Sequence, residues 1–487
     1  MRMLKGRHLF IDDDLVSDSD NIVFTVNPPC KEGRTIRPDR PWDAASACVN
    51  STVLDGDECR LYYVGTDKAA RHFLCMALSS DGRRWRKPEL GAFRYGRSKK
   101  NNIVLEDTRI SGTVFVDPAG KRSQRYKFLS ADGKRGARLF VSPNGLDFKL
   151  LRTDLMPFYL DNHICGFRDN RIGKYVVYMR GWSPPNEGYR WMGFREIARA
   201  ELDDVTTPWP YNRRARLRMM GKNALPVVHG QFPCVMRRDE QDPPTMDIYN
   251  LSAVKYPFAE DVYLGFPSVY YRYPFPPAGK YINNGMLEIQ LAVSRDGVKW
   301  RRYRTPYVGG GIHGEPDWAR LHMGVGMVFR GDIIYQYYRG LNILHGQGRT
   351  GLREYEPPPP ESRPSRTLGL GTLSQRVDGF VSADAAYRGG TLTTKPFVFG
   401  GSGLSVNMNT TAMGTARVVL LNRNKRPVKG FAAGDCDVIQ GNFAKKQVTW
   451  RGSGDVSSLR GKPVRLRFDM RAAKLYAFEF SPTPGTG

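Results

Sequence analysis

The chain has 487 residues, more than one hydrophobic core usually holds, so we expect two domains. It is 40% hydrophobic with 51 glycines and 33 prolines, which suits short strands joined by turns, and no apolar run approaches the roughly 18 residues of a membrane helix. The net charge of +26 favours anionic partners, but the basic residues are spread along the chain without a nucleic-acid-binding motif, so we expect neither nucleic acid nor a membrane as partner.

The N-terminus and the cysteines bear on location and cofactors. Residues 1–7 lead straight into a strand-like segment at 8–11 without an apolar signal-peptide segment. The protein is therefore expected to be cytoplasmic, or exported and lacking its leader. Seven cysteines, without C-x-x-C spacing, predict free and mostly buried thiols and no zinc site. We expect no cofactor or catalytic metal; a structural Ca²⁺ and the oligomeric state stay open.

Pairs of strands recur along the first 353 residues. Five stretches rich in Tyr, Val and Ile are predicted central strands: 59–64, 125–129, 174–179, 261–266 and 333–338. A further strand and a turn precede each of them, beginning near residues 51, 113, 164, 252 and 325. We interpret these as five blades.

A turn phrase recurs with the strands. Residues 79–85 read SSDGRRW, residues 294–300 read SRDGVKW, and residues 142–148 read SPNGLDF. Asp-Gly and Asn-Gly supply turn positions with positive φ. We therefore assign Asp81, Asp147 and Asp296 to structure. Strand-and-turn repeats at intervals of tens of residues indicate a β-propeller.

The rest of the chain completes an all-β fold: a five-bladed β-propeller with a C-terminal β-sandwich domain. Residues 1–353 form the predicted propeller and catalytic domain. Residues 354–366 contain four consecutive prolines and predict a linker. Residues 367–487 contain at least six strand-like runs and predict the sandwich.

Carboxylates stand at one structural position in all five predicted blades. They directly precede the innermost strands, whose ends converge at one mouth of a propeller. Clustered carboxylates separate one another's pKa values, so that one serves as acid and another as base or nucleophile in glycosidic cleavage. The candidate catalytic residues are Asp43, Asp107, Asp161, Asp247 and Glu315.

Candidate substrate-binding residues lie beside these carboxylates: Trp42, His163, Tyr249, Asp317, Trp318 and Arg180. Each carboxylate has an alternative interpretation as a turn residue that caps the backbone. A structural role is equally open for His163, and His229, His313, His322 and His345 line the mouth or cap loops. The arginines near the mouth (Arg180, Arg190, Arg195, Arg320 and Arg339) suggest a sulfated or uronic substrate.

Several segments together carry a family resemblance: residues 9–13 (LFIDD), the S-x-D-G-x-x-W turns, and residues 161–163 (DNH), 263–268 (YLGFPS), 379–382 (GFVS) and 474–478 (KLYAF). With them the chain resembles the five-bladed propeller glycoside hydrolases, the superfamily of invertases and arabinanases. It is most similar to bacterial proteins related to the invertase-type N-terminal domain.

The resemblance implies a role for one carboxylate in each of the first three blades. Asp43 would be the nucleophile or base, Asp107 the modulator, and Asp161 the general acid. The chain has PWDAA at 41–45 in place of the invertase phrase, so the roles depend on structural position, and Glu315 or Asp247 stays open as the acid.

The predicted function is a glycoside hydrolase acting on a carbohydrate, with paired carboxylates at the propeller mouth. The substrate would be an anionic polysaccharide or oligosaccharide. Two alternatives are a non-catalytic glycan-binding propeller and a scaffold for protein partners. A binding module need not bring two carboxylates within catalytic range, and a scaffold would have a flat mouth.

Overall fold

The computed structural model describes residues 2–106, 111–132, 134–161, 163–184, 193–215, 217–219, 225–272, 283–346 and 368–481. Within these ranges strands dominate, and the helical elements are two 3-10 turns, η1 (Arg122–Gln124) and η4 (Ser457–Leu459). The predicted all-β class is confirmed. No helix in these ranges is long and apolar enough to cross a membrane.

The chain divides into two compact units, each described by itself. The larger unit contains residues 29–255 and 263–374, and the smaller contains residues 1–28, 256–262 and 375–487. This division differs from the predicted one, because the first 28 residues belong with the C-terminal strands. The predicted linker at 354–366 lies outside the described residues.

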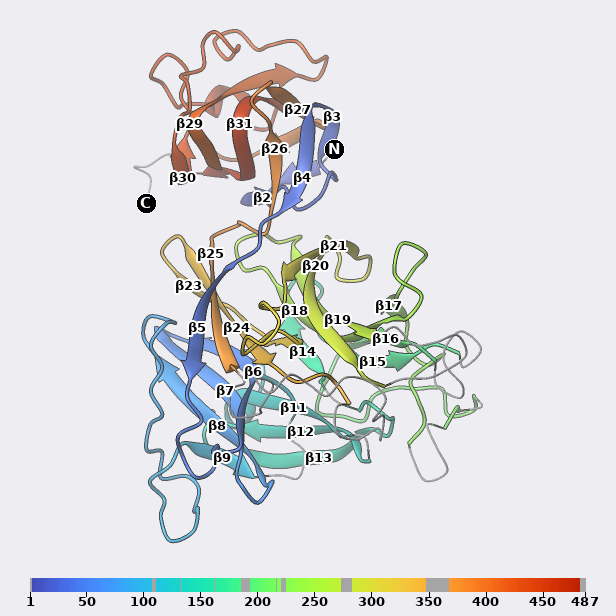
Figure 1. Ribbon diagram of the computed structural model, residues 1–487. Coiled ribbons are helices and arrows are strands. Elements are labelled where there is room, and N and C mark those ends of the chain that lie inside the picture. Colours follow the sequence, from blue (N-terminus) through green and yellow to red (C-terminus); the bar gives the residue numbers. More distant parts are fainter. Residues whose placement is uncertain are drawn as a thin grey trace. The chain divides into compact units, whose positions relative to one another are not determined.

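The larger unit contains three antiparallel sheets of four strands, which follow one another in chain order (Figure 1). The first contains β6 (Ser46–Asp55), β7 (Glu58–Thr66), β8 (His72–Ser79) and β9 (Ile103–Glu106). The second contains β10 (Gly112–Val116), β11 (Tyr126–Asp132), β12 (Gly136–Ser142) and β13 (Lys149–Met156). The third contains β14 (Cys165–Asp169), β15 (Lys174–Trp182), β16 (Arg195–Leu202) and β17 (Cys234–Met236).

A nine-stranded sheet completes this unit and falls into two parts. The first part is antiparallel: β18 (Met246–Lys255), β19 (Tyr263–Arg272), β20 (Gly285–Ser294) and β21 (Arg301–Val308). The second is β22 (Arg320–Met323), β23 (Val328–Arg330), β24 (Ile333–Leu341), β25 (Gly369–Arg376) and β5 (Cys30–Ile36). The single parallel pair Leu287–Arg320 joins them. We refer to the three sheets and these two parts as the five strand groups.

The five predicted central strands are the middle strands of these groups. They are β7, β11, β15, β19 and β24, each paired in antiparallel register with the strand predicted before it. Strand β5 comes from the start of the unit and pairs with β25 near its end. The fifth strand group therefore combines both ends of this part of the chain.

The repeated turn has one hydrogen-bonding pattern in all three copies. In the third copy, the Gly297 backbone N–H donates to Ser294 Oγ (2.9 Å). Asp296 Oδ1 accepts from the N–H groups of Val298 and Lys299, both at 2.8 Å. In the second copy, Asn144 Oδ1 accepts the equivalent hydrogen bonds from the N–H groups of Leu146 and Asp147. The predicted structural role of this turn is confirmed.

Tyrosines connect neighbouring strand groups. The hydroxyl of a central-strand tyrosine donates to the glycine carbonyl of the turn in the next group: Tyr62 to Gly145 (2.9 Å), Tyr178 to Gly297 (2.7 Å) and Tyr337 to Gly82 (2.6 Å). The last bond connects the fifth group to the first. In the opposite direction, Tyr126, Tyr175 and Tyr263 donate to Asp55, Asp117 and Asp169 in the preceding groups.

Apolar packing follows the same order. One buried cluster lies between the first and second groups, another between the second and third, and a third between the third and fourth. A further cluster combines residues of the first group, such as Leu61 and Tyr63, with Val328 and Tyr337 of the fifth. Each group is therefore covered on its face by a neighbour, and the last group packs on the first.

The smaller unit is a ten-stranded, hydrogen-bonded sheet. Its longest strands, β29 (Gly403–Asn422) and β31 (Val464–Ser481), pair with each other along most of their length and enclose a core that includes Phe468 and Phe478. The other strands are β1 (Arg2–Leu4), β2 (Arg7–Leu9), β3 (Val16–Asp20), β4 (Ile22–Val26), β26 (Val381–Ala385), β27 (Gly390–Thr394), β28 (Phe397–Phe399) and β30 (Asn442–Gln447).

Candidate functional site: a histidine- and arginine-lined cavity

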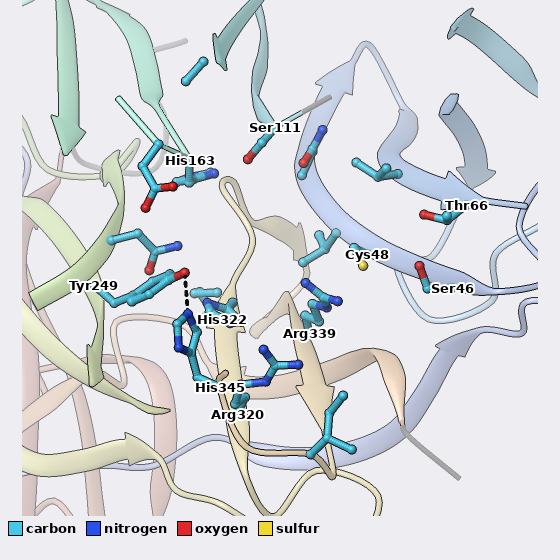
Figure 2. A pocket seen from close by; sticks show the side chains of 18 of the residues that line it. Ser46, Cys48, Thr66, Ser111, His163, Tyr249, Arg320, His322, Arg339 and His345 are labelled. Atoms are coloured by element: carbon cyan, nitrogen blue, oxygen red, sulfur yellow. Dashed lines mark hydrogen bonds between the residues drawn. The ribbon is translucent and has the colours of Figure 1, made fainter. Parts of the chain in front are cut away.

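A cavity of about 740 Å³ lies in the larger unit. All five strand groups contribute to its wall, each from its first strand or from the residues just before that strand. These contributions are Ser46, Cys48 and Asn50; Ser111; Asp161 and His163; Tyr249 and Asn250; and Arg320 and His322, in the order of the groups. Asn283, Arg339 and His345 add to the wall (Figure 2).

Asp161 is the one carboxylate among the described residues that line the cavity. Its Oδ2 accepts from Arg180 Nη1 at 2.7 Å, and its backbone has a φ of 59°. Burial favours a higher pKa, but the positive charges of Arg180 and Arg195 outweigh it and hold the pKa of Asp161 below its ordinary value. The carboxyl group is therefore ionised at neutral pH.

Four histidines line the same cavity (His72, His163, His322 and His345), and the last three are in their neutral form. Burial, together with the charge of Arg180, lowers the pKa of His163 to about 4. Burial and nearby arginines lower the pKa of His345 to about 3, and they also lower that of His322. At neutral pH these imidazoles can accept a proton but carry no charge.

Tyr249 lies at the centre of this cluster. Its hydroxyl is 3.2 Å from His345 Nε2, and its ring centroid is 5.6 Å from that of His322. The guanidinium groups of Arg180 and Arg195 lie over its ring at 4.6 and 5.2 Å. Both guanidinium groups are therefore within cation–π distance of this ring.

Arg320 and Arg339 give the cavity its positive charge. Arg339, on β24, is half-buried and has no ion-pair partner among the described residues. Asp161 does not offset this charge, because Arg180 already neutralises it. A guanidinium group in this setting suits a carboxylate or sulfate ligand.

Two of the predicted catalytic carboxylates are buried away from the cavity wall. Asp43 is fully buried, 2.5 Å from Lys87 Nζ, and also accepts from Tyr63. Burial raises its pKa although Lys87 and Tyr63 oppose the shift. Asp247 is fully buried between Arg195 (2.6 Å) and Arg272 (3.1 Å).

The predicted carboxylates of the fifth group are also elsewhere. Glu315 is exposed, and its Oε2 accepts from the backbone N–H of Ile312. Asp317 is buried and accepts from Lys31 and Tyr338, each at 2.8 Å. Asp107 lies outside the described residues.

Some of the predicted binding residues lie at the cavity, and others are packed in the interior. His163 and Tyr249 line the cavity, and Arg180 donates to Asp161, which also lines it. Trp42 is buried and donates to Asn102 Oδ1 (2.8 Å), while Trp318 is buried beside His313. These two indole rings therefore pack in the interior and do not form the wall of the cavity.

The lining residues that the sequence analysis did not name include Ser46, Cys48 and Asn50, which alternate along β6. Arg320 and His322, which it placed near the mouth, alternate along β22. Alternate residues of a strand face one side. The signal was this alternation within the first strands, whereas our prediction used the residues before them.

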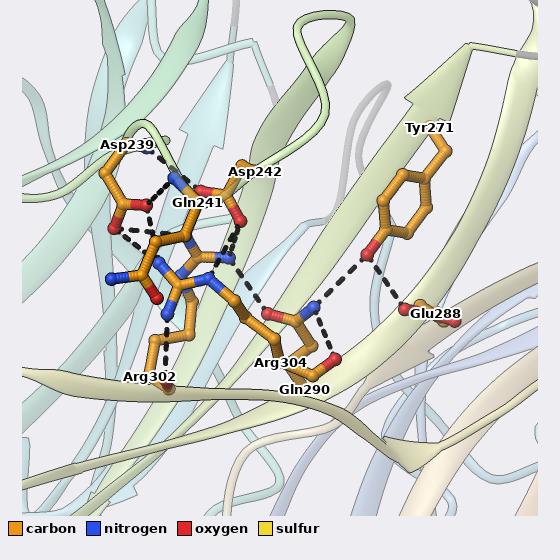
Figure 3. Close-up of polar contacts among 8 residues, drawn as sticks. All are labelled: Asp239, Gln241, Asp242, Tyr271, Glu288, Gln290, Arg302 and Arg304. Atoms are coloured by element: carbon orange, nitrogen blue, oxygen red, sulfur yellow. Dashed lines mark hydrogen bonds and ion pairs between the residues drawn. The ribbon is translucent and has the colours of Figure 1, made fainter.

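A second polar cluster lies on β19, β20 and β21 (Figure 3). Arg302 binds Asp242, and Arg304 binds both oxygens of Asp239 (2.5 and 2.6 Å). Tyr271 donates to Glu288, whose pKa is raised by burial. These residues do not line the cavity, and their contacts fix the segment around residue 240 to β21.

Two further features exclude some kinds of site. All seven cysteines are free thiols, four of them buried. Among the described residues, no group of three or more His, Cys, Asp or Glu is arranged to hold a metal ion.

Comparison with known proteins was made at the levels of sequence and structure. No family model matches the chain, and no curated protein is significantly similar to it. Structural neighbours are glycoside hydrolases. The alignment with one glycoside hydrolase covers 72% of this chain and 92% of the neighbour's chain, at 13% identity and a TM-score of 0.44. A glycosyl hydrolase from Bacteroides ovatus covers 70% and 93% at 14% identity and a TM-score of 0.40. A thermostable family-43 glycoside hydrolase covers 69% and 93% at 13% identity and a TM-score of 0.39. At TM-scores below 0.5 these likenesses carry no argument about the function of this chain.

Proposed function

We propose that the protein is a carbohydrate-active enzyme that takes an anionic saccharide into the cavity and cleaves a glycosidic bond there. The observation that carries the proposal is the composition of the wall. One ionised carboxylate, four imidazoles of which three are neutral, a phenol and two guanidinium groups line a cavity of about 740 Å³, which is ample for a sugar residue.

The proposed fold is a five-bladed β-propeller with a C-terminal β-sandwich. Its support is the cyclic order of contacts, in which tyrosine hydrogen bonds and apolar clusters connect successive strand groups and the fifth with the first. The pairing of β5 with β25 would close the ring in the last blade. The cavity would then lie at the central axis, where first strands converge.

The anionic substrate follows from the charges on the wall. Arg180 neutralises Asp161, so Arg339, which has no ion-pair partner among the described residues, leaves an excess of positive charge. A neutral glycan would leave the Arg339 guanidinium without an anionic partner in a partly desolvated site, which costs free energy. A uronate or sulfate group would supply that partner.

Asp161 is the described carboxylate that we assign to the reaction. Because it is ionised, it fits the role of base, nucleophile or stabiliser of a cationic transition state, rather than the general acid implied by the resemblance. Asp107 stays the predicted second carboxylate for hydrolysis. We assign Asp43 and Asp247 to structure, because each is buried in an ion pair.

A polysaccharide digestion screen read by product chromatography tests the proposal. We expect products from acidic polysaccharides and none from neutral ones. The Asp161→Asn variant should lose at least about 100-fold in rate while it keeps its melting temperature. Near-full activity of that variant on a cleaved substrate would remove Asp161 from the reaction.

A non-catalytic glycan-binding protein is the second candidate. The observation that favours it is that a single carboxylate lines the described cavity, whereas hydrolysis by paired carboxyl groups needs two. Calorimetric binding of acidic oligosaccharides without any product would support this candidate and reject the enzyme.

A further inference from the structure

We infer that the cavity cleaves a uronic-acid glycoside by β-elimination, with His163 as the base, Tyr249 as the acid and Arg339 as the carboxylate-binding group. The inference rests on the proposed function, since it names the substrate class and bond-breaking step of that same cavity. The three residues come from different strand groups and line one space (Figure 2).

The hydrogen bonds of His163 leave one ring nitrogen ready to accept a proton. Ser252 donates its hydroxyl hydrogen to the Met323 carbonyl (2.7 Å). In its contact with His163 Nε2 (3.4 Å), Ser252 Oγ must therefore accept, so Nε2 carries the hydrogen of the neutral ring. Nδ1 of His163 is then unprotonated and has no hydrogen-bond donor among the described residues.

The hydrogen bonds of His345 orient Tyr249 in the complementary way. Nδ1 of His345 is 3.4 Å from the Asn283 carbonyl oxygen, which can only accept, so Nδ1 carries the hydrogen. Nε2 therefore accepts from the Tyr249 hydroxyl at 3.2 Å. Tyr249 is thus held as a proton donor, with the guanidinium groups of Arg180 and Arg195 over its ring.

The guanidinium groups would make it easier to remove the proton that lies next to the carboxylate of the substrate. The hydrogen on C5 of a uronate is weakly acidic, because the carboxylate disfavours further negative charge. Arg339, with Arg320 beside it in the wall, would neutralise that carboxylate and stabilise charge that develops on it in the transition state.

The step balances without water or an oxidant. Nδ1 of His163 takes the proton from C5, and the C–H electron pair forms the C4–C5 double bond. The bond between C4 and its glycosidic oxygen breaks, and the leaving oxygen takes the Tyr249 proton. The products are an unsaturated uronate and a free hydroxyl group, and proton transfer from His163 through solvent restores Tyr249.

Elimination also fits the carboxylate count better than hydrolysis. Hydrolysis by the usual route needs two carboxyl groups across the scissile bond. The described wall has one, and it is tied to Arg180. Elimination needs a base, an acid and a cation that neutralises the carboxylate of the substrate, and His163, Tyr249 and Arg339 in the wall would supply them.

The test uses the full-length protein with alginate, polygalacturonate and glucuronan, each beside a carboxyl-reduced form of the same polymer. We expect an ultraviolet-absorbing unsaturated product from at least one native polymer and none from its reduced form. Tyr249→Phe and His163→Gln should each lower the rate at least about 100-fold, with bound oligosaccharide still measured by calorimetry. Tyr387→Phe, at an exposed tyrosine of the smaller unit, is the matched control and should keep the full rate.

The outcomes separate the inference from the proposed function. A saturated product that incorporates oxygen from labelled water would overturn elimination and leave glycosidic cleavage standing. Binding of a uronate polymer without any product would overturn elimination and favour the glycan-binding candidate. Absence of binding by every acidic polymer would overturn both. Should Tyr249→Phe not fold, the product's double bond and the reduced-polymer control decide the question with the wild-type protein.

Discussion

At the scale of single residues, the cavity combines groups whose charge states are set by one another. Arg180 is the centre of this arrangement, because it binds Asp161, contacts the Tyr249 backbone carbonyl and lowers the pKa of His163. The same guanidinium group thus keeps a carboxylate charged and adds to the effect of burial, which is the main reason that the imidazole stays neutral. This is how a site obtains both a base and a fixed charge at neutral pH.

The neutral state of His163 predicts a pH-dependent stability. Its pKa is about 4 when folded and near 6.5 when unfolded, so between these values the unfolded chain binds a proton that the folded site does not. His163 therefore makes the free energy of unfolding decrease as pH falls from about 6.5 to about 4. Urea denaturation at several pH values across this range should show that the free energy of unfolding falls less steeply with pH in His163→Gln than in wild type. Parallel curves would contradict the assigned charge state.

At the scale of elements, the repeated turn is a small unit that the sequence specifies completely. Asp296 Oδ1 accepts two backbone hydrogen bonds, and Gly297 has a φ of 74° with an added Cβ meeting the Tyr178 hydroxyl at 2.9 Å. Asp296→Ala should lower the free energy of unfolding by about 2 kcal/mol, because both N–H groups lose their acceptor.

The second copy of the turn, which has Asn in place of Asp, suggests the control variant. Asp296→Asn keeps an oxygen in the same place, and Asn144 accepts the equivalent bonds in the second copy. Urea denaturation should show that Asp296→Asn loses much less unfolding free energy than Asp296→Ala does. Equal losses in the two variants would show that the side-chain oxygen does not hold the turn.

A second prediction at the scale of elements concerns the contribution of buried ion pairs to stability. Asp247→Ala leaves Arg195 and Arg272 buried without their anion, and should cost about 3–5 kcal/mol of unfolding free energy. Asp239→Ala is the matched control, since its pair with Arg304 is half-exposed and should cost about 1 kcal/mol or less. Loss of activity in a fully stable Asp247→Ala protein would instead return Asp247 to the candidate catalytic residues.

The strands and turns could be predicted because their determinants are local. Period-two alternation located β7, β15 and β24, and the Asp-Gly phrase located the turns. The cavity wall was predicted in part: Asp161, His163 and Tyr249 lie in it, but Asp43 and Asp247 are buried in ion pairs. Sequence alone does not show whether an acidic residue near a strand start meets Lys87, Arg195 or open space, since those partners are distant in the chain.

At the scale of the whole molecule, the net charge of +26 and the local charge of the cavity act together. A strongly basic protein attracts acidic polymers from a distance, while Arg339 and Arg320 would select the group that enters the cavity. The general attraction is screened by salt, whereas a guanidinium–carboxylate contact in a partly desolvated cavity is screened less.

The most direct test of an anionic-saccharide site is calorimetric titration of an oligogalacturonate into wild type, Arg339→Gln and Arg301→Gln. Arg301 is an exposed arginine on β21, so both variants lose the same net charge. We predict that Arg339→Gln weakens binding about 10-fold or more at high salt, as expected for loss of a charged hydrogen bond, while Arg301→Gln binds like wild type. Equal affinities of the two variants would contradict the assignment of the cavity as the binding site.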